Sequence, residues 1–186
     1  MRVELKMRKL TLKFTLLTLL LCVLCAPVAA QGGDEKPKPY AVENNELKLA
    51  APVIFADGSD KLSPEAERAL AVVKDFLNEK TYITLLRIEG HTDAGGGDAD
   101  DATAGQRISE RRALAVARWL VEQGVDCKRV LPIGFGATKP VAPNDTAENR
   151  AKNRRLAFTF ASLRGRLIGG QPADGGGQSA GDPCQK

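Results

Sequence analysis

The middle of the chain switches from strand-like to helix-like apolar spacing and back again. Residues 83–89 (ITLLRIE) and residues 130–136 (VLPIGFG) are short apolar runs, each typical of a buried strand. Between them, residues 108–124 repeat apolar side chains at helical spacing, at Val116, Leu120 and Val121. Two strands joined through a helix usually lie parallel in one sheet, because the helix carries the chain back to the end where it started. This unit limits the chain to folds in which helices pack on a sheet.

Apolar segments on both sides extend the alternation. Residues 52–56 (PVIFA) predict a short strand, residues 63–79 a helix, and residues 155–160 (RLAFTF) a half-buried strand with alternating apolar positions. A short helix is expected at residues 146–153. The order β-α-β-α-β-β predicts an α/β (α+β) two-layer sandwich with a mixed parallel and antiparallel sheet.

The first 30 residues have the pattern of a signal peptide. A basic stretch is followed by an apolar run at residues 14–26 and by the small residues that signal peptidase requires, which end at Ala30. We therefore predict a secretory signal at residues 1–30 that is cleaved, whether the chain starts at Met1 or at Met7. An uncleaved membrane anchor is the alternative, although the apolar stretch is short for a membrane span.

Composition divides residues 31–186 into three parts. Residues 31–50 are polar, contain two prolines and predict a linker. Residues 51–163 hold nearly all the large apolar side chains, which is enough for one core of ordinary domain size. Residues 164–186 contain seven glycines and two prolines, so their apolar surface cannot offset the entropy cost of ordering, and we expect a disordered tail.

Charge and cysteine content narrow the function classes once the predicted signal is removed. The whole chain carries a net charge of +4, but residues 31–186 contain 22 Lys+Arg and 22 Asp+Glu. This neutrality removes the electrostatic reason to expect a nucleic-acid partner. Cys127 and Cys184 are the thiols left in an oxidising compartment. We predict a disulfide between them, with two free thiols as the alternative.

The segment at residues 88–105 is the best candidate for a binding site, since ligands gather where the strands of an α/β sheet end. It holds the only histidine, His91, with four aspartates and five glycines. A catalytic histidine would need a nucleophile, and no G-x-S-x-G motif is present, so we predict no enzyme. One histidine offers too few ligands for zinc, and the aspartates lack the spacing of a calcium loop, so no metal and no cofactor are expected. We interpret His91 as a hydrogen-bonding structural group.

Four ordered motifs resemble a known family over roughly residues 50–162. They are G-H-T-D at residues 90–93, S-x-x-R-A at 109–113, G-F-G-x-x-x-P at 134–140, and N-D-T-x-x-x-R-x-x-N-R-R at 144–155. In this order they resemble the OmpA-like peptidoglycan-binding domain, which occurs in outer-membrane proteins, peptidoglycan-associated lipoproteins and flagellar stator subunits.

The resemblance implies noncovalent binding of the diaminopimelate of the peptidoglycan stem peptide. By this resemblance, Asp93 binds the ammonium group of the ligand and Arg112 binds a carboxylate. Arg154 is implied as a further anion contact, and Thr92 flanks the site. One carboxylate and one guanidinium suit a ligand that ends in an amino acid head group.

Two forms of such a protein remain open. The first is a soluble periplasmic anchor, associated with the cell wall and the outer membrane, with an outer-membrane protein or porin as a possible partner and a homodimer as a possible state. The second is a membrane-tethered anchor related to flagellar stator subunits. A stator would need an intramembrane acid for proton flow, and no acid lies between Lys13 and Ala30.

Overall fold

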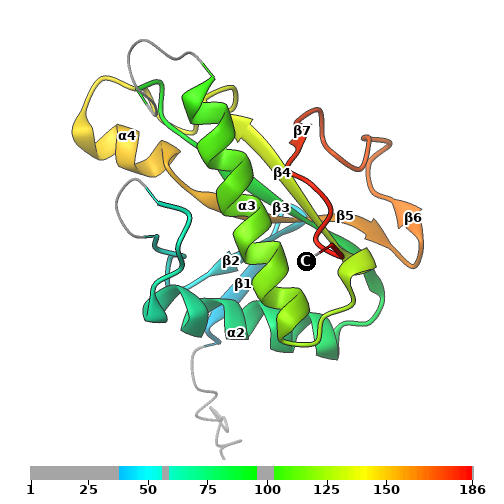
Figure 1. Cartoon of the computed structure of the whole chain (residues 1–186). Coiled ribbons are helices and arrows are strands. Elements are labelled where there is room, and N and C mark those ends of the chain that lie inside the picture. The colour runs from blue at the N-terminus through cyan, green and yellow to red at the C-terminus, as the bar shows by residue number, and fades with distance from the viewer. Residues whose placement is uncertain (1–37, 56–58, 96–102, 186) are drawn as a thin grey trace, which may run out of the picture. The chain divides into compact units, whose positions relative to one another are not determined.

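A computed structural model describes residues 38–55, 59–95 and 103–185 of the chain. The predicted signal peptide at residues 1–30 lies outside the described residues. The described part forms a mixed sheet with α2 (Pro64–Glu79) and α3 (Ala104–Glu122) packed on one face (Figure 1). The predicted two-layer α/β architecture is therefore confirmed.

The sheet has the strand order β1-β2-β5-β3-β4-β7, and β6 pairs with β5. The strands are β1 (Tyr40–Glu43), β2 (Glu46–Leu49), β3 (Ile83–His91), β4 (Val130–Gly136), β5 (Leu156–Leu163), β6 (Arg166–Leu167) and β7 (Gln178–Ser179). β3 and β4 are parallel and are joined through α3, whereas the other pairs are antiparallel. The sheet is thus mixed, as the sequence pattern predicts.

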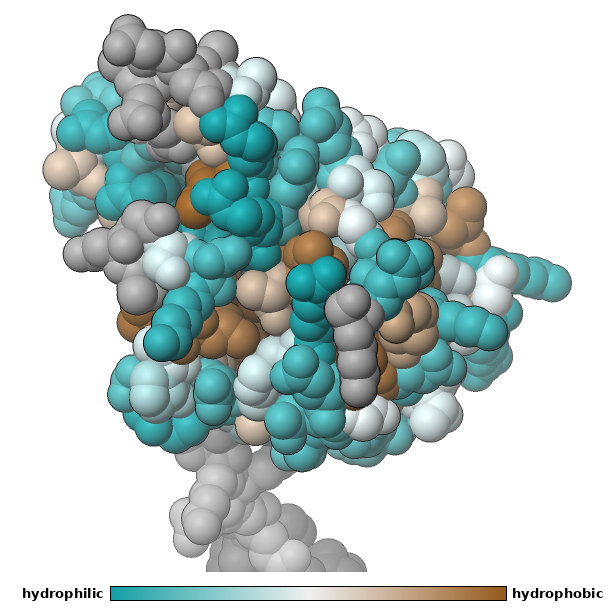
Figure 2. Space-filling model, in the orientation of Figure 1, coloured by the Kyte–Doolittle hydropathy of each residue, from teal (hydrophilic) through white to brown (hydrophobic). Residues whose placement is uncertain are grey.

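The core fills the space between the two long helices and the sheet. Its fully buried members include Leu70, Leu77, Leu86, Ile88 and Leu120. The short helices η1 (Cys127–Arg129) and α4 (Ala147–Asn153) follow α3 and β4 along the chain. On the side that carries α2 and α3, the described surface is largely hydrophilic with smaller apolar patches (Figure 2). This is the surface expected of amphipathic helices that bury one face in the core.

The N-terminal half of α3 lies very close to the ends of β3 and β4. A Cβ atom added to Gly90 would lie 2.1 Å from the carbonyl oxygen of Ser109, so only glycine fits there. The Ser109 hydroxyl accepts a hydrogen bond from the Gly136 backbone N–H at 3.0 Å and donates one to the Gln106 carbonyl at 2.7 Å. These contacts hold α3 against the strand ends where the candidate site lies.

The prediction of a strand at residues 52–56 is wrong for the described residues 52–55. They form no strand and make one isolated bridge, between Phe55 and Leu62. Two strands, β1 and β2, are instead formed by residues 40–49. These residues lie inside the segment predicted to be a linker, so the linker prediction is wrong for them. β1 and β2 form a hairpin around Asn44 and Asn45, which have φ values of 50° and 64°. Asparagine tolerates such positive φ angles, and this allows the tight turn.

The C-terminal tail was predicted to be disordered, yet residues 164–185 follow a defined path along the sheet. β7 pairs with β4 at the sheet edge. Gly177 packs against the side chains of Ile133 and Phe135, and Gly175 lies over the guanidinium group of Arg87. The prediction was wrong because the glycines let the backbone approach these side chains closely, so the tail covers surface without large apolar residues of its own.

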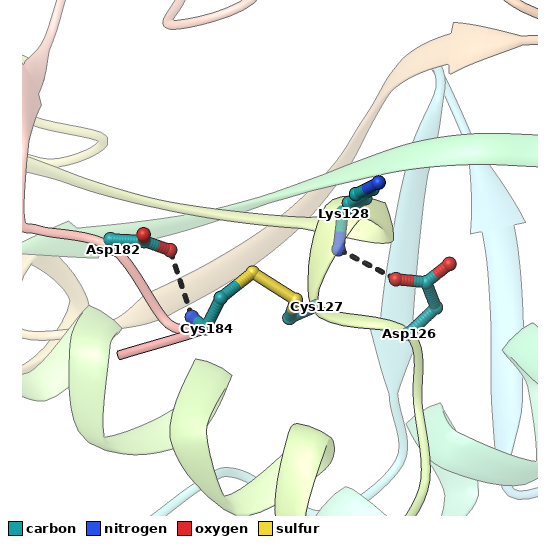
Figure 3. The surroundings of a disulfide bond; sticks show 5 residues. All are labelled: Asp126, Cys127, Lys128, Asp182 and Cys184. Carbon is teal, nitrogen blue, oxygen red and sulfur yellow. Dashed lines mark hydrogen bonds between the residues drawn. A yellow bond between two sulfur atoms is a disulfide. The ribbon is translucent and has the colours of Figure 1, made fainter. Parts of the chain in front are cut away.

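The predicted disulfide between Cys127 and Cys184 is confirmed, with a Cα–Cα distance of 5.3 Å (Figure 3). An aspartate orders the backbone beside each cysteine. Asp126 accepts a hydrogen bond from the Lys128 N–H at 3.0 Å, and Asp182 accepts one from the Cys184 N–H at 2.8 Å. The bond therefore joins the end of the tail to η1.

Candidate ligand-binding site

The Asp93 carboxylate lies just beyond the carboxyl end of β3. The residue is only 6% exposed. One carboxylate oxygen accepts a hydrogen bond from the Gly95 N–H at 3.1 Å, and the other forms an ion pair with the Arg154 guanidinium. The Arg154 side chain, which follows α4, remains 46% exposed. The site therefore has a fixed, largely desolvated negative charge, and the long side chain of Arg154 places a half-exposed positive charge beside it.

Thr92 precedes Asp93 in the chain and is held by its backbone. The Thr92 N–H donates to the Gly136 carbonyl at 2.9 Å, and the preceding His91 N–H donates to the Arg155 carbonyl at 3.0 Å. The Thr92 hydroxyl is buried and has no hydrogen-bond partner among the described residues. An unpaired buried hydroxyl costs about 1 to 3 kcal/mol and is uncommon in structural positions. Because it is unpartnered and directly precedes Asp93, this hydroxyl is a candidate ligand contact.

The segment that carries Arg154 is tied to the residue after Asp93. The fully buried side chain of Asn153 accepts hydrogen bonds from the N–H groups of residues 141–142 at 2.8 and 3.0 Å. It also donates to the Asn144 side-chain oxygen at 2.9 Å, and this oxygen accepts from the Ala94 N–H at 3.1 Å. The asparagines of the fourth motif therefore hold Arg154 beside the carboxylate. This role was not predicted from the sequence, although both asparagines belong to the fourth motif.

Arg112 lies half-buried in the first half of α3. Its Nε–H donates to the Ser59 carbonyl at 3.0 Å, and its guanidinium carbon lies 5.0 Å from the centroid of the Phe55 ring. Within the described residues, the ion pair of Asp93 is with Arg154 rather than with Arg112. The structure thus pairs Asp93 with Arg154, directly after Thr92 in the chain, and places Arg112 against the segment before α2. Their roles in binding a ligand stay predictions.

A charged network lies on the sheet face opposite the helices. The Arg87 Nε–H donates to Glu89 at 2.6 Å, and the His91 Nε2 lies 3.3 Å from the other Glu89 oxygen. Burial raises the pKa of Glu89, but hydrogen bonds from His91 and Arg87 and the Arg87 charge outweigh it and lower the pKa to about 2. Burial lowers the pKa of His91 despite its bond to Glu89. The histidine ring also stacks on Phe135, with centroids 5.3 Å apart.

These contacts give His91 a structural place, as the sequence suggested. The Arg87–Glu89 pair was not predicted, although two charges at alternate positions of an apolar strand could have indicated it.

Neither a metal site nor a membrane helix emerges from the described ranges. No group of three or more His, Cys, Asp or Glu side chains within residues 38–55, 59–95 and 103–185 could hold a metal ion. In the same ranges, no helix has both the length and the apolar character needed to cross a bilayer. The aspartate-rich stretch at residues 98–101 lies outside the described residues.

The fold and site define an α/β domain that presents a fixed carboxylate at the end of its central parallel strand. Residues 54–154 match the OmpA family. The chain belongs to this family, as the motifs predicted.

Known relatives and solved structures agree with this membership. The chain is 34% identical over 138 residues to Outer membrane protein A of Bordetella avium, covering 74% of this chain and 66% of the relative. A MotB-like protein from Desulfovibrio vulgaris has a similar structure, with a TM-score of 0.56, 31% identity, and coverage of 64% and 77% of the two chains. The cell wall anchor of the T6SS from Pseudomonas aeruginosa gives a TM-score of 0.54, 26% identity, and coverage of 71% and 94%. The chain spans 53% to 66% of the length of the first curated relatives that it matches.

Proposed function

We propose that this protein binds peptidoglycan noncovalently, through the diaminopimelate of the stem peptide, and so anchors the cell wall in the periplasm. The observation that carries the proposal is the Asp93 carboxylate, which is buried at the end of β3 and yet accessible through a half-exposed partner, Arg154. The buried Thr92 hydroxyl, one residue before Asp93, has no hydrogen-bond partner among the described residues and offers a ligand a further polar contact.

The chemistry of the site fits the head group of an amino acid. Asp93 binds the ligand ammonium, which shares the carboxylate with Arg154 or takes its place. Arg112 binds the carboxylate of the same head group as a planar fork, and Arg154 adds a second anion contact. The Thr92 hydroxyl completes the set, because it can donate to a carboxylate or accept from an ammonium. No covalent step is needed, and the protein acts as a binding module rather than as an enzyme.

The relatives support an anchoring role. One structural neighbour is described as a cell wall anchor, and Outer membrane protein A of Bordetella avium carries its location in its name. We therefore propose a periplasmic location at the outer membrane, reached through cleavage of the signal at residues 1–30. An outer-membrane protein or porin as partner, and a homodimer, are part of this proposal.

A membrane-tethered anchor of the stator type is the second candidate, and the similarity to the MotB-like structure favours it. The two candidates differ in the fate of the N-terminal segment. The N-terminal residue and the mass of the protein recovered from the periplasm distinguish them. Cleavage after Ala30 supports the soluble anchor, whereas an intact N-terminus in the membrane fraction supports the tethered one.

Sedimentation with purified peptidoglycan sacculi tests the proposed function. We expect the protein to pellet with the sacculi, to be released by an excess of diaminopimelate-containing stem peptide, and to leave the sacculi chemically intact. A heat-killed sample controls for spontaneous release of fragments. Protein that stays in the supernatant would contradict binding, and soluble muropeptides above the control would contradict the assignment as a nonenzymatic module.

A further inference from the structure

Arg112 is oriented by a segment that lies far from it in the chain. Its Nε–H donates to the Ser59 carbonyl, 53 positions earlier, at 3.0 Å. Its guanidinium carbon lies 5.0 Å from the centroid of the Phe55 ring, within the range of a cation–π interaction. The neighbouring Arg111 adds a longer ion pair to Asp60, at 3.8 Å. The segment before α2 therefore contributes to where the guanidinium of Arg112 lies.

The Phe55 ring is itself held in place. It is partly buried and packs against the hydrophobic core. Its backbone forms the isolated bridge to Leu62, and the Ser63 N–H donates to the Ile54 carbonyl at 3.4 Å next to it. A ring fixed in this way presents one face to the arginine in a constant orientation.

A preoriented arginine binds an anion at lower entropic cost than a free one. The long arginine side chain loses much rotamer freedom when it grips a carboxylate, and this loss is reduced if the free protein already restricts it. We infer that Phe55 is a positioning residue for ligand recognition: its ring holds Arg112 in the orientation in which the guanidinium binds the ligand carboxylate. The inference rests on the proposed function, since it assigns Phe55 a task at the same site.

Two substitutions separate the ring face from simple apolar packing. Phe55→Leu keeps an apolar side chain but removes the ring, whereas Phe55→Tyr keeps the ring. We expect Phe55→Leu to weaken binding of a diaminopimelate-containing stem peptide about threefold to tenfold, and Phe55→Tyr to bind about as well as the wild type. Titration calorimetry on the purified protein measures both affinities.

A role that acts through Arg112 has a further signature. Phe55→Leu should have no effect on the weaker binding of a peptide whose distal carboxylate is amidated. Equal weakening for the amidated and the unmodified peptide, or equal weakening by the leucine and tyrosine variants, would show that Phe55 acts through general packing and would overturn the inference.

A measurement without ligand keeps this inference separate from the proposed function. In the wild type and in Phe55→Tyr, the Arg112 Nε–H resonance should be shifted upfield by the ring current and should exchange slowly with water. In Phe55→Leu it should move to the position of a solvated arginine. An unchanged resonance in Phe55→Leu would overturn the positioning role. Failure of the wild type to bind the peptide, with the expected resonance shifts present, would instead overturn the proposed function alone.

Discussion

Asp93 and Arg154, which lie 61 positions apart in the chain, form an ion pair at the carboxyl end of β3. The aspartate is 6% exposed, whereas the arginine side chain is 46% exposed. A ligand cation can therefore displace the arginine into solvent far more easily than the aspartate can move. The pair keeps the buried charge compensated in the free protein and leaves the carboxylate available to a ligand.

Removing either proposed ligand charge should abolish measurable binding of a diaminopimelate-containing stem peptide. In Asp93→Ala and Arg112→Ala, one charge of the bound ligand would be desolvated without a partner, and such truncations cost about 2 to 5 kcal/mol. Lysine-containing peptides and peptides with an amidated distal carboxylate should bind the wild type more weakly, because they lack the anion that Arg112 binds. Titration calorimetry measures the affinities, and circular dichroism checks that each variant folds.

Matched surface charges serve as controls for these variants. Asp75 on α2 and Arg118 on α3 are exposed. Their replacement by alanine should change the binding free energy by less than about 1 kcal/mol, as for ordinary surface charges. Affinities within about threefold of the wild type for both Asp93→Ala and Arg112→Ala would show that neither residue binds the ligand.

Reducing the disulfide should loosen the C-terminal tail. The bond between Cys127 and Cys184 spans 57 positions, and closing such a loop contributes up to about 4 kcal/mol in the chain-entropy model. We expect dithiothreitol to lower the free energy of unfolding and to speed hydrogen exchange at the Ala180 amide, which donates to Pro132 in the paired edge. The Cys127→Ser/Cys184→Ser double variant should not respond to reductant. Two alkylatable thiols in the untreated protein would disprove the bond.

Periodicity was sufficient to predict the centre of the fold. β3 and β4 are buried along most of their length and α3 buries one face, so two apolar runs and one helical spacing indicated these elements. The hairpin of β1 and β2 escaped prediction because its strands are four residues long and half polar, and only the Asn44-Asn45 turn indicated it. The tail escaped because its order depends on a distant cysteine and on contacts made by glycine backbone.

The motifs named the proposed site residues, whose ligand contacts stay predictions, but did not predict how these residues pair. Thr92 and Asp93 follow β3 directly, so their place depended on one strand. The pairing of Asp93 with Arg154 depends on how α4 is tied down by Asn153, and no local pattern contains that information. Arg112 likewise contacts Phe55 and Ser59, which lie far from it in the chain.

The close approach of α3 to β3 predicts an unusually costly substitution. In Gly90→Ala the new methyl group would lie 2.1 Å from the Ser109 carbonyl oxygen, which belongs to a helix backbone that cannot rotate away. We expect a loss of about 3 kcal/mol or more in the free energy of unfolding. Gly165→Ala is the control, because its methyl group would meet no atom within 4 Å and only its φ of +77° adds strain, of about 1 kcal/mol. Urea denaturation of both variants tests the contact, and equal losses would contradict it.

Acid should destabilise the domain through the network under the tail. The folded pKa of Glu89, about 2, lies below its ordinary value of 4.5, so its stabilisation is complete above pH 4.5 and is lost as the pH falls toward 2. This loss amounts to at most about 3 kcal/mol. The pKa of His91 is also lowered in the folded state, so protonation of the unfolded chain begins to reduce stability below pH 6.5.

Urea denaturation between pH 7.5 and pH 3 should therefore show stability falling in two stages. Glu89→Gln should be less stable at neutral pH but should flatten the stage below pH 4.5 and keep the earlier one. An unaltered acid slope in Glu89→Gln would rule out this carboxylate as the titrating group.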